Sequence, residues 1–300
     1  MSGGGGFGGY RSIGTSSQLS SSTSGAQASQ HEIEMNEFLE DLLKDYNKRD
    51  VAAIRTHLNE IEKVLGREIE GLDRILFGGS ISKNTFIEGA SDVDALVILD
   101  RAKYKDATPK ELQNAFAKML QQRFPRTEIK CGSLAVTIKY KDYEIQLLPA
   151  LRNNGKLQIA SNDGACWSTS INSAKFTEKL TATNKMNSNK VVPVIKLAKS
   201  LLSNLPSKYQ LSGYHVEALA VDAFSTYNGR CTLYDMTMHF LNYSTKRVLT
   251  PMSDVTGQSG IIDDNLGIAR SITRQKLSGH IKDIAGRFLG ATSDAKKLFD

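Results

Sequence analysis

A glycine and a serine, Gly79 and Ser80, stand where the chain could bind a phosphate. They follow a short apolar stretch at residues 74–77, which predicts a buried strand. Gly79 permits a tight turn and a close approach of the backbone to a ligand. The residues after Ser80 predict the start of a helix, whose free N–H groups suit phosphate, and the Ser80 hydroxyl can donate to a phosphate oxygen. The pair therefore predicts a nucleotide-binding turn.

Two aspartates, Asp92 and Asp94, follow this turn and lead into a second apolar strand at residues 95–99. Side chains two apart in an extended segment point to one side, so both carboxylates can reach the same metal ions. Mg²⁺ (or Mn²⁺) prefers oxygen ligands and takes a triphosphate as co-ligand. Two such ions would activate an attacking hydroxyl and stabilise the leaving pyrophosphate. A DxD alone is more often a solvated turn, but its combination with strand, Gly-Ser and strand predicts a catalytic metal site.

Other elements must position these residues. Apolar spacing predicts helix from about residue 32 to about residue 65. Further predicted elements are a helix at 109–124, a β-hairpin of residues 134–140 and 143–148, and helices at 173–184, 191–202, 214–227, 233–242 and 268–289. Strands thus concentrate in the first half and helices in the second, with a ligand cleft expected between the halves.

The organisation along the chain follows from composition. Residues 1–30 are rich in Gly, Ser, Thr and Gln and bury too little apolar surface to fold, so they are predicted to be a disordered arm. Residues 31–170 are predicted to form the catalytic core and residues 171–300 a helical domain.

The order strand, Gly-Ser, DxD, strand resembles the DNA polymerase β nucleotidyltransferase superfamily. Residues 191–200 (Val-Val-Pro-Val-Ile-Lys-Leu-Ala-Lys-Ser) and 212–218 (Ser-Gly-Tyr-His-Val-Glu-Ala) resemble segments of cyclic GMP-AMP synthase and oligoadenylate synthase relatives. Residues 251–259 resemble a loop of the bacterial defence members. The chain is therefore similar to the cGAS/DncV-like nucleotidyltransferases over most of residues 35–290. This resemblance implies an α+β fold, with a mixed sheet and flanking helices in a polymerase β-like core and a helical C-terminal domain.

The resemblance also implies roles for three residues of the second half. Lys199 falls where the family's lysine holds the triphosphate, and Tyr214 falls where its tyrosine stacks on a base. Ser212 belongs to the same nucleotide-binding segment, whereas Gly213 replaces a family serine and so removes one phosphate contact. On residue type alone, Lys199 could be an exposed helix lysine and Tyr214 a core residue.

The third metal carboxylate of the family is missing, because its position, before two apolar residues and a proline, is Gln146. An amide oxygen can bind Mg²⁺ but is a poor base. The protein could be a pseudoenzyme that only binds nucleotide. Glu144 could substitute, although roughly 6.5–7 Å of strand separates the two positions. The favoured interpretation is an inactivated variant of an enzyme with glutamate at position 146.

The arm begins Met-Ser-Gly-Gly-Gly-Gly, and removal of Met1 would leave Ser2 first. A serine hydroxyl on a flexible tether, which spans on the order of 30 Å, could serve as a nucleophile or primer. This start resembles the nucleotidyltransferase of the Hailong antiphage system, and that resemblance implies priming of DNA oligomers from deoxyadenosine triphosphate. The alternative is a solubilising tail.

Charge, cysteine content and hydropathy indicate in which cellular compartment the protein is expected. The net charge of +6 favours acidic partners such as nucleotides. The three cysteines are scattered without a CxxC pair, which disfavours structural zinc and suits a reducing compartment. No apolar run approaches the roughly 18 residues of a membrane helix, and the N-terminus lacks a signal-peptide pattern, so the cytoplasm is expected.

The sequence therefore predicts a nucleotidyltransferase that joins nucleoside triphosphates into an oligonucleotide signal for antiphage defence. Its product would act on a separate effector protein, no membrane is involved, and a homo-oligomer is left open. Three alternatives remain: a cyclic oligonucleotide synthase, a catalytically dead nucleotide-binding regulator, and a transferase that modifies tRNA or protein.

Overall fold

The computed structural model describes residues 17–48, 51–87, 93–132, 134–140, 143–153, 156–161, 164–168, 173–254 and 260–299. Two of the predicted site residues, Ser2 and Asp92, lie outside these ranges, so their roles stay predictions.

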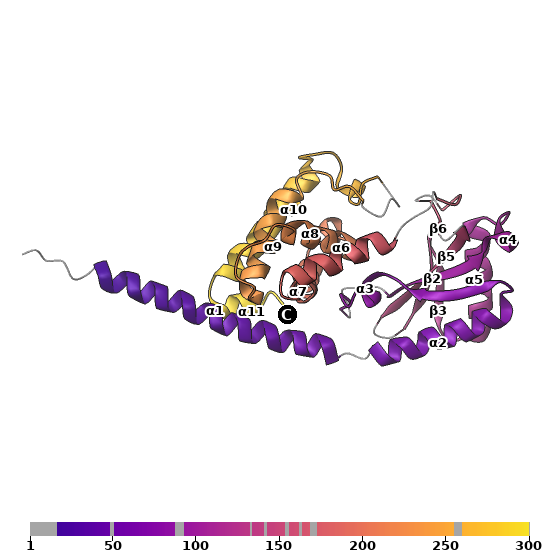
Figure 1. The fold of residues 1–300 in the computed structure, drawn as a ribbon, viewed down its shortest axis with the longest axis horizontal. Helices are drawn as coiled ribbons and strands as arrows, with labels where there is room; N and C mark the ends of the chain where they lie inside the picture. Colours follow the sequence, from indigo (N-terminus) through magenta and orange to yellow (C-terminus); the bar gives the residue numbers. More distant parts are fainter. Residues whose placement is uncertain are drawn as a thin grey trace, which may run out of the picture.

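Six strands of the described residues form one mixed sheet in the order β1-β2-β5-β4-β3, with β6 also paired to β5 (Figure 1). Only β2 and β5 run parallel among these pairs; the others are antiparallel. The predicted hairpin is confirmed as the β4–β5 pair. The strands are β1 Leu72–Phe77, β2 Val93–Asp100, β3 Glu128–Cys131, β4 Val136–Lys139, β5 Glu144–Asn153 and β6 Lys156–Ile159.

Two helices, α2 (Val51–Glu68) and α5 (Pro109–Arg123), cover one face of this sheet. Alternate residues of β2, from Val93 to Leu99, point into the core beneath them. Residue 94 and its even-numbered neighbours therefore lie on the opposite face, because successive strand side chains alternate. A capping box between Thr108 and Glu111 starts α5 where the sequence predicts a helix.

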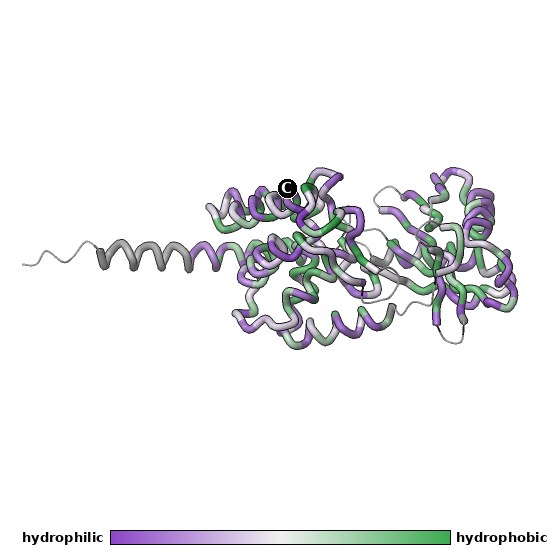
Figure 2. Tube along the Cα trace, turned by 90° about the horizontal axis from the view of Figure 1, so that it is seen from above, coloured by the Kyte–Doolittle hydropathy of each residue, from purple (hydrophilic) through white to green (hydrophobic). Residues whose placement is uncertain are grey.

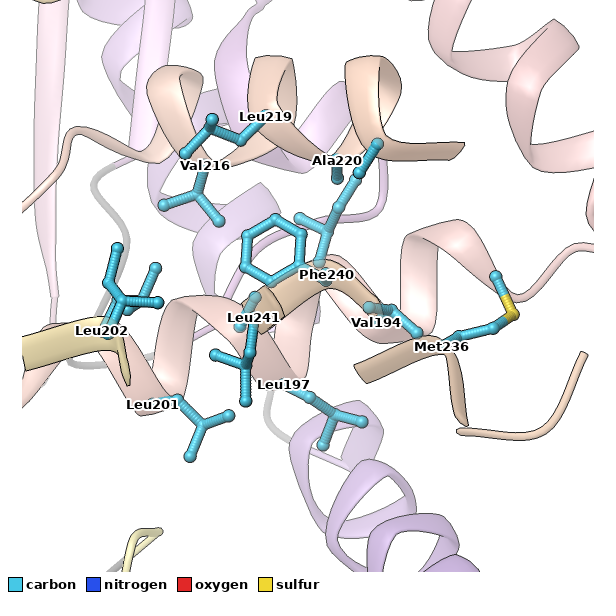
Figure 3. Packing of buried hydrophobic residues seen from close by; sticks show 14 of the residues in the cluster. Val194, Leu197, Leu201, Leu202, Val216, Leu219, Ala220, Met236, Phe240 and Leu241 are labelled. Atoms are coloured by element: carbon cyan, nitrogen blue, oxygen red, sulfur yellow. The ribbon is translucent and has the colours of Figure 1, made fainter. Parts of the chain in front are cut away.

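A second hydrophobic core lies in the helical half. Side chains from α7, α8 and α9 meet there, with Phe240 among Val194, Leu219 and Leu241 (Figure 3). In Figure 2 the hydrophobic segments lie within each half, and the two halves lie next to each other along the long axis. The helices of this half are α6 Ser173–Met186, α7 Val191–Ser203, α8 Gly213–Phe224, α9 Leu233–Arg247, α10 Ile272–Leu289 and α11 Thr292–Lys296.

The long helix α1 (Ser17–Lys48) packs on the helical half rather than on the sheet (Figure 1). Its buried residues Met35, Leu39 and Leu43 belong to the helical core. Helix α1 begins at Ser17, within the predicted arm; the division of the chain into an arm of residues 1–30, a catalytic core and a helical domain stays a prediction. Residues 1–16 lie outside the described ranges.

Candidate active site

The glycine turn contacts Asp94 directly. The N–H of Gly78 donates to the backbone oxygen of Asp94 at 2.8 Å. Gly79 has a φ of +55°, and a Cβ there would overlap Oδ2 of Asp94 and lie 3.0 Å from its Cγ. Only glycine leaves room for the carboxylate at this point. Ser80 follows at the start of the short helix α3 (Gly79–Ser82) and is buried. The structure thus brings Gly79 into contact with Asp94, with Ser80 next along the chain; the roles of these residues in nucleotide and metal binding stay predictions.

Gln146 lies beside Asp94. The two residues are register partners in the parallel β2–β5 pair, and Thr137 of β4 is the partner of Gln146 on its other side. All three side chains face away from α2 and α5. Within the described ranges, no group of three His, Cys, Asp or Glu side chains is placed to hold a metal ion. Asp94 and Gln146 nevertheless offer a carboxylate and an amide oxygen, the donors that Mg²⁺ accepts.

Lys199 of α7 is buried next to this turn, so it is not an exposed helix lysine. Its ammonium pairs with Oε1 of Glu217 at 2.9 Å and donates to the backbone and hydroxyl oxygens of Thr85 at 3.1 and 3.3 Å. Burial lowers the pKa of Lys199, against the opposite effects of Glu217 and, more weakly, Asp94. Lys199 therefore lies within the electrostatic influence of the predicted metal ligand.

Glu217 of α8 holds a second lysine, Lys83, through its other carboxylate oxygen. Burial alone would raise the pKa of Glu217, but Lys199 and Lys83 together hold it below its ordinary value. Sequence reasoning missed Lys83, Thr85 and Glu217. One signal was available: Glu217 is a charged residue inside the apolar run 216–221, where a buried charge needs a partner.

Tyr214, predicted to stack on a base, lies half-buried at the start of α8. Its ring contacts that of Phe176 edge-on, with centroids 4.8 Å apart, and its hydroxyl donates to Asp254 at 2.8 Å. Ser212 caps the same helix, accepting a hydrogen bond from the N–H of His215 at 3.1 Å. The described contact of Ser212 is thus a helix cap, which orients the Tyr214 backbone.

Residues 30–184, just over half of the chain, match the family described as Second Messenger Oligonucleotide or Dinucleotide Synthetase domain, abbreviated SMODS. The chain belongs to this family.

Solved structures show the same fold. Escherichia coli MS115-1 CdnC in complex with HORMA-deltaN aligns with a TM-score of 0.59 at 14% identity, over 82% of this chain and 87% of that chain. Elizabethkingia meningoseptica CdnE cyclic dinucleotide synthase, with GTP and Apcpp, gives 0.58 at 16% identity over 79% and 92%. Vibrio cholerae DncV cyclic AMP-GMP synthase, with a linear intermediate, gives 0.60 at 12% identity over 75% and 67%. A search of curated protein sequences finds no match.

The comparisons confirm the resemblance to cGAS/DncV-like nucleotidyltransferases and the α+β, polymerase β-like fold. Family and fold together support a nucleotidyltransferase related to second-messenger synthases. The narrower resemblance to the Hailong nucleotidyltransferase is not confirmed. No helix in the described part of the chain is both long and apolar enough to cross a membrane.

A cavity of about 290 Å³ lies between the two halves of this SMODS protein. Residues 82–84, after the glycine turn, form one wall. Thr177 and Thr181 of α6 and Val192 of α7 line the other. The cavity therefore lies between the sheet half and the helical half, where a cleft is expected.

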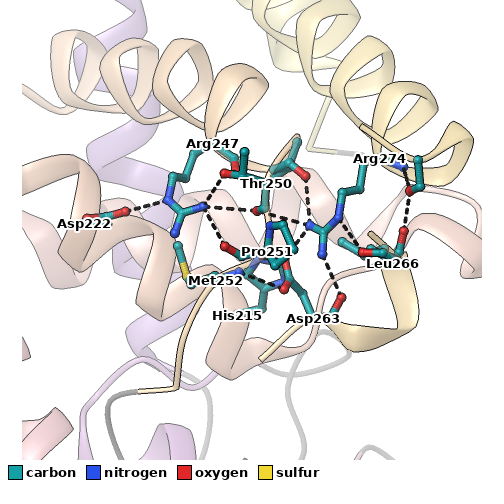
Figure 4. Close-up of polar contacts among 12 residues, drawn as sticks. His215, Asp222, Arg247, Thr250, Pro251, Met252, Asp263, Leu266 and Arg274 are labelled. Carbon is teal, nitrogen blue, oxygen red and sulfur yellow. Dashed lines mark hydrogen bonds and ion pairs between the residues drawn. The ribbon is translucent and has the colours of Figure 1, made fainter. Parts of the chain in front are cut away.

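A polar cluster holds the segment of residues 250–252 in this SMODS protein (Figure 4), shortly before Asp254 in the sequence. Arg274 of α10 pairs with Asp263 at 2.7 Å and donates to the backbone oxygen of Val248 at 3.0 Å. Asp263 also accepts from the N–H of Met252 at 3.0 Å. Nε2 of His215 lies 3.6 Å from Oδ2 of Asp263. Burial lowers the pKa of His215 to about 4, so this histidine is neutral at pH 7. The cluster fixes the loop against the base of α8, next to Tyr214.

Proposed function

We propose that this protein is a metal-dependent nucleotidyltransferase that joins nucleoside triphosphates into an oligonucleotide signal. The observation that carries the proposal is the contact between the Gly78-Gly79 turn and Asp94, with Gln146 as the register neighbour of Asp94. A phosphate-binding turn packed against a carboxylate is the arrangement that phosphoryl transfer needs, because positioning and charge stabilisation supply most of its catalysis.

In this proposal Asp92 and Asp94 hold Mg²⁺ or Mn²⁺, and Gln146 stands beside them. The metal, when bound, would activate the attacking hydroxyl and stabilise the pyrophosphate. The chain's own residues do the positioning. Ser80 donates to a phosphate oxygen, and Gly79 keeps the space between the turn and Asp94 open. The attacking group is a nucleotide 3′- or 2′-hydroxyl, or Ser2 of the arm in the first step.

The remaining nucleotide contacts come from the helical half. Lys199 supplies positive charge at the triphosphate site, and its position beside Thr85 and Glu217 supports this role. Tyr214 stacks on the base, and Ser212 supports it by capping α8. Base stacking on an aromatic ring is worth roughly 1–3 kcal/mol per base in single-strand binders.

The amide at position 146 weakens this enzyme. Gln146→Glu would restore a third carboxylate next to Asp94, and we expect turnover to rise by about 10²- to 10⁴-fold, the range of a well-placed catalytic base. Gln121→Glu makes the same chemical change on the exposed surface of α5 and should leave turnover unchanged. Equal, non-zero rates for the parent and Gln146→Glu would contradict this expectation, whereas no turnover by either form would favour the second candidate, a nucleotide-binding regulator without catalysis.

Intact-protein mass spectrometry identifies the product. The parent and Gln146→Glu are incubated with Mg²⁺ and each ribo- and deoxyribonucleoside triphosphate in turn. A ladder of nucleotide masses on the protein would mean priming from the chain, with deoxyadenosine triphosphate and Ser2 as the expected pair. Removal of residues 1–9 should then abolish initiation but not triphosphate binding. Free oligonucleotide beside unmodified protein would mean a cyclic or linear second-messenger synthase.

We further propose that the product serves antiphage defence in the cytoplasm by acting on a separate effector. The complex of E. coli CdnC with HORMA-deltaN supports the idea that a protein of this fold can bind a partner protein. A homo-oligomer would bring arms of neighbouring subunits to the site.

A further inference from the structure

Three charged side chains form a buried cluster where α8 meets the glycine turn. The exposed fractions of the side chains are 9% for Lys83, 2% for Lys199 and 1% for Glu217. Two ammonium groups thus share one carboxylate. Asp94 is the next negative charge that affects Lys199, but under the proposed function Asp94 is committed to a metal ion. An excess positive charge in a buried cluster is costly, and a bound anion would balance it.

Lys83 and Lys199 differ in the number of N–H donors that remain available for a ligand. An ammonium group has three N–H donors. Lys199 directs them at three oxygens: Oε1 of Glu217, and the backbone and hydroxyl oxygens of Thr85. Lys83, in contrast, pairs with a single oxygen acceptor within the described part of the chain, Oε2 of Glu217. Lys83 therefore keeps donors available for a ligand, whereas Lys199 does not.

The ammonium of Lys83 also faces the aromatic pair that includes the proposed base-binding residue. It lies 5.1 Å from the ring centroid of Phe176 and 5.7 Å from that of Tyr214. A cation over an aromatic face is held by the ring's charge distribution and does not use its hydrogen-bond donors. In sequence, Lys83 is three residues after Ser80. Its charge thus lies between the proposed base site and the phosphate-binding turn.

We infer that Lys83 is the lysine that donates to the phosphates of the bound nucleoside triphosphate. Glu217 and Lys199 are positioning residues: Lys199 fixes Glu217 and Thr85, and Glu217 holds the Lys83 ammonium between the turn and Tyr214. This inference rests on the proposed function and refines the role of Lys199 in it. The ligand class is a nucleoside triphosphate, recognised at this point by its phosphate charge rather than by its base.

The test measures binding without turnover. Isothermal titration calorimetry compares ATP, inorganic tripolyphosphate and adenosine on the full chain with Mg²⁺. Lys83→Met keeps the apolar stem over the rings but removes the charge. We expect its dissociation constants for ATP and tripolyphosphate to rise by about 10- to 100-fold, as for loss of a charge-assisted hydrogen bond. Adenosine affinity should stay within about twofold, because adenosine carries no phosphate. Lys179→Met, an exposed position on α6, is the control for net charge and should match the parent.

Other outcomes separate the inference from the proposed function. Lys83→Arg should recover most of the lost affinity, because it restores the charge and donors; a purely structural lysine would show equal ATP affinity in all three forms. Unchanged tripolyphosphate binding by a folded Lys83→Met protein overturns the inference. A parent that binds tripolyphosphate through Lys83 but forms no oligonucleotide contradicts the proposed activity and leaves the inference standing. A parent that binds neither anion contradicts both.

Discussion

The sheet half and the helical half of this protein position polar groups by different means. In the sheet half, Asp94 and Gln146 are neighbours because β2 and β5 pair in parallel register, and the backbone of Gly78 fixes the turn against Asp94. In the helical half, Asp263 and Arg274 are held by side-chain bonds that reach from helix to loop. The first arrangement depends on backbone conformation, and the second depends on charge.

Each half is therefore destabilised by a different kind of substitution. A sheet ladder survives most changes of side chain, but it does not tolerate a side chain where the backbone needs glycine. A buried ion pair tolerates no loss of one partner, because the remaining charge is left uncompensated in a medium of low dielectric constant. Three predictions, ordered by their expected effect on the free energy of unfolding, test this contrast.

The largest loss is expected for Arg274→Met. Arg274 is fully buried and donates to Asp263 and to the backbone oxygens of Val248, Thr250 and Gly267. Its removal leaves the Asp263 carboxylate buried without its main partner, which costs about 3–5 kcal/mol. Urea unfolding measures the loss. Arg247→Met is the matched control, because the Arg247 side chain is 23% exposed and pairs with a partly exposed Asp222, and we expect about 1 kcal/mol there. Equal losses would mean that charge burial does not set the stability of this half.

The second prediction concerns pH. Burial lowers the pKa of His215 from 6.5 to about 4, and Arg274 and Arg247 add to the effect while Asp263 opposes it. The folded state therefore keeps this histidine neutral, whereas the unfolded chain takes up a proton below its ordinary pKa. Stability from this group is complete above pH 6.5 and falls as the pH drops toward 4, by about 2–3 kcal/mol at pH 4.5. Urea unfolding at pH 7 and pH 4.5 checks it. His215→Gln should lose less stability than the parent across this interval; an identical loss would exclude His215 as the cause.

Much of the sheet half could be predicted from the sequence. Alternating apolar residues predict the hairpin of β4 and β5, and the Gly-Ser and DxD motifs predict that Gly79 and Asp94 belong to one site, although their direct contact was not predicted. The strands β3 and β6 were not predicted, because each has four residues and β3 is largely exposed, so neither shows a clear alternation. Motifs on strands can be recognised in the sequence because the residues that they contact lie on neighbouring strands, and the register of those strands follows from the apolar pattern.

The helices of the helical half were predicted from the sequence, but the ion pairs and hydrogen bonds between their buried polar side chains were not. The helix predicted from residue 268 begins at Ile272, since Arg270 has a φ of 56° and Ser271 caps the helix by accepting from the N–H of Arg274. The pairing of Thr85 with Glu217 joins residues 132 positions apart. Sequence periodicity indicates which residues are buried, but it does not indicate which buried charges meet. The Lys83 cluster therefore required the structure.

The smallest loss of stability, and the most local one, is expected for Gly79→Ala. Gly79 has a φ of +55°, and its new Cβ would overlap the Asp94 carboxylate. A residue with a Cβ costs about 1–2 kcal/mol in this conformation. The adjacent Gly78→Ala is the matched control, because its φ is −102° and its Cβ would lie 3.6 Å from the nearest atom, the backbone oxygen of Asp94. We expect that variant to stay within about 0.5 kcal/mol of the parent, as substitutions without a special backbone or packing role do.

The activity of Gly79→Ala, measured in the Gln146→Glu form, should fall by about 10²-fold or more, because a methyl group displaces Asp94 by roughly 1 Å and misplaced reacting groups lose that much rate. A modest change of stability with a large loss of turnover would show that the backbone conformation of Gly79 sets the position of the Asp94 carboxylate. Arg274→Met should give the opposite ratio, a large loss of stability with turnover per folded molecule reduced much less. Gly78→Ala and Gly79→Ala could instead lose equal activity and equal stability. The position of Asp94 would then depend on strand β2 alone and not on the backbone conformation of Gly79. The proposed contrast between the sheet half and the helical half would be contradicted.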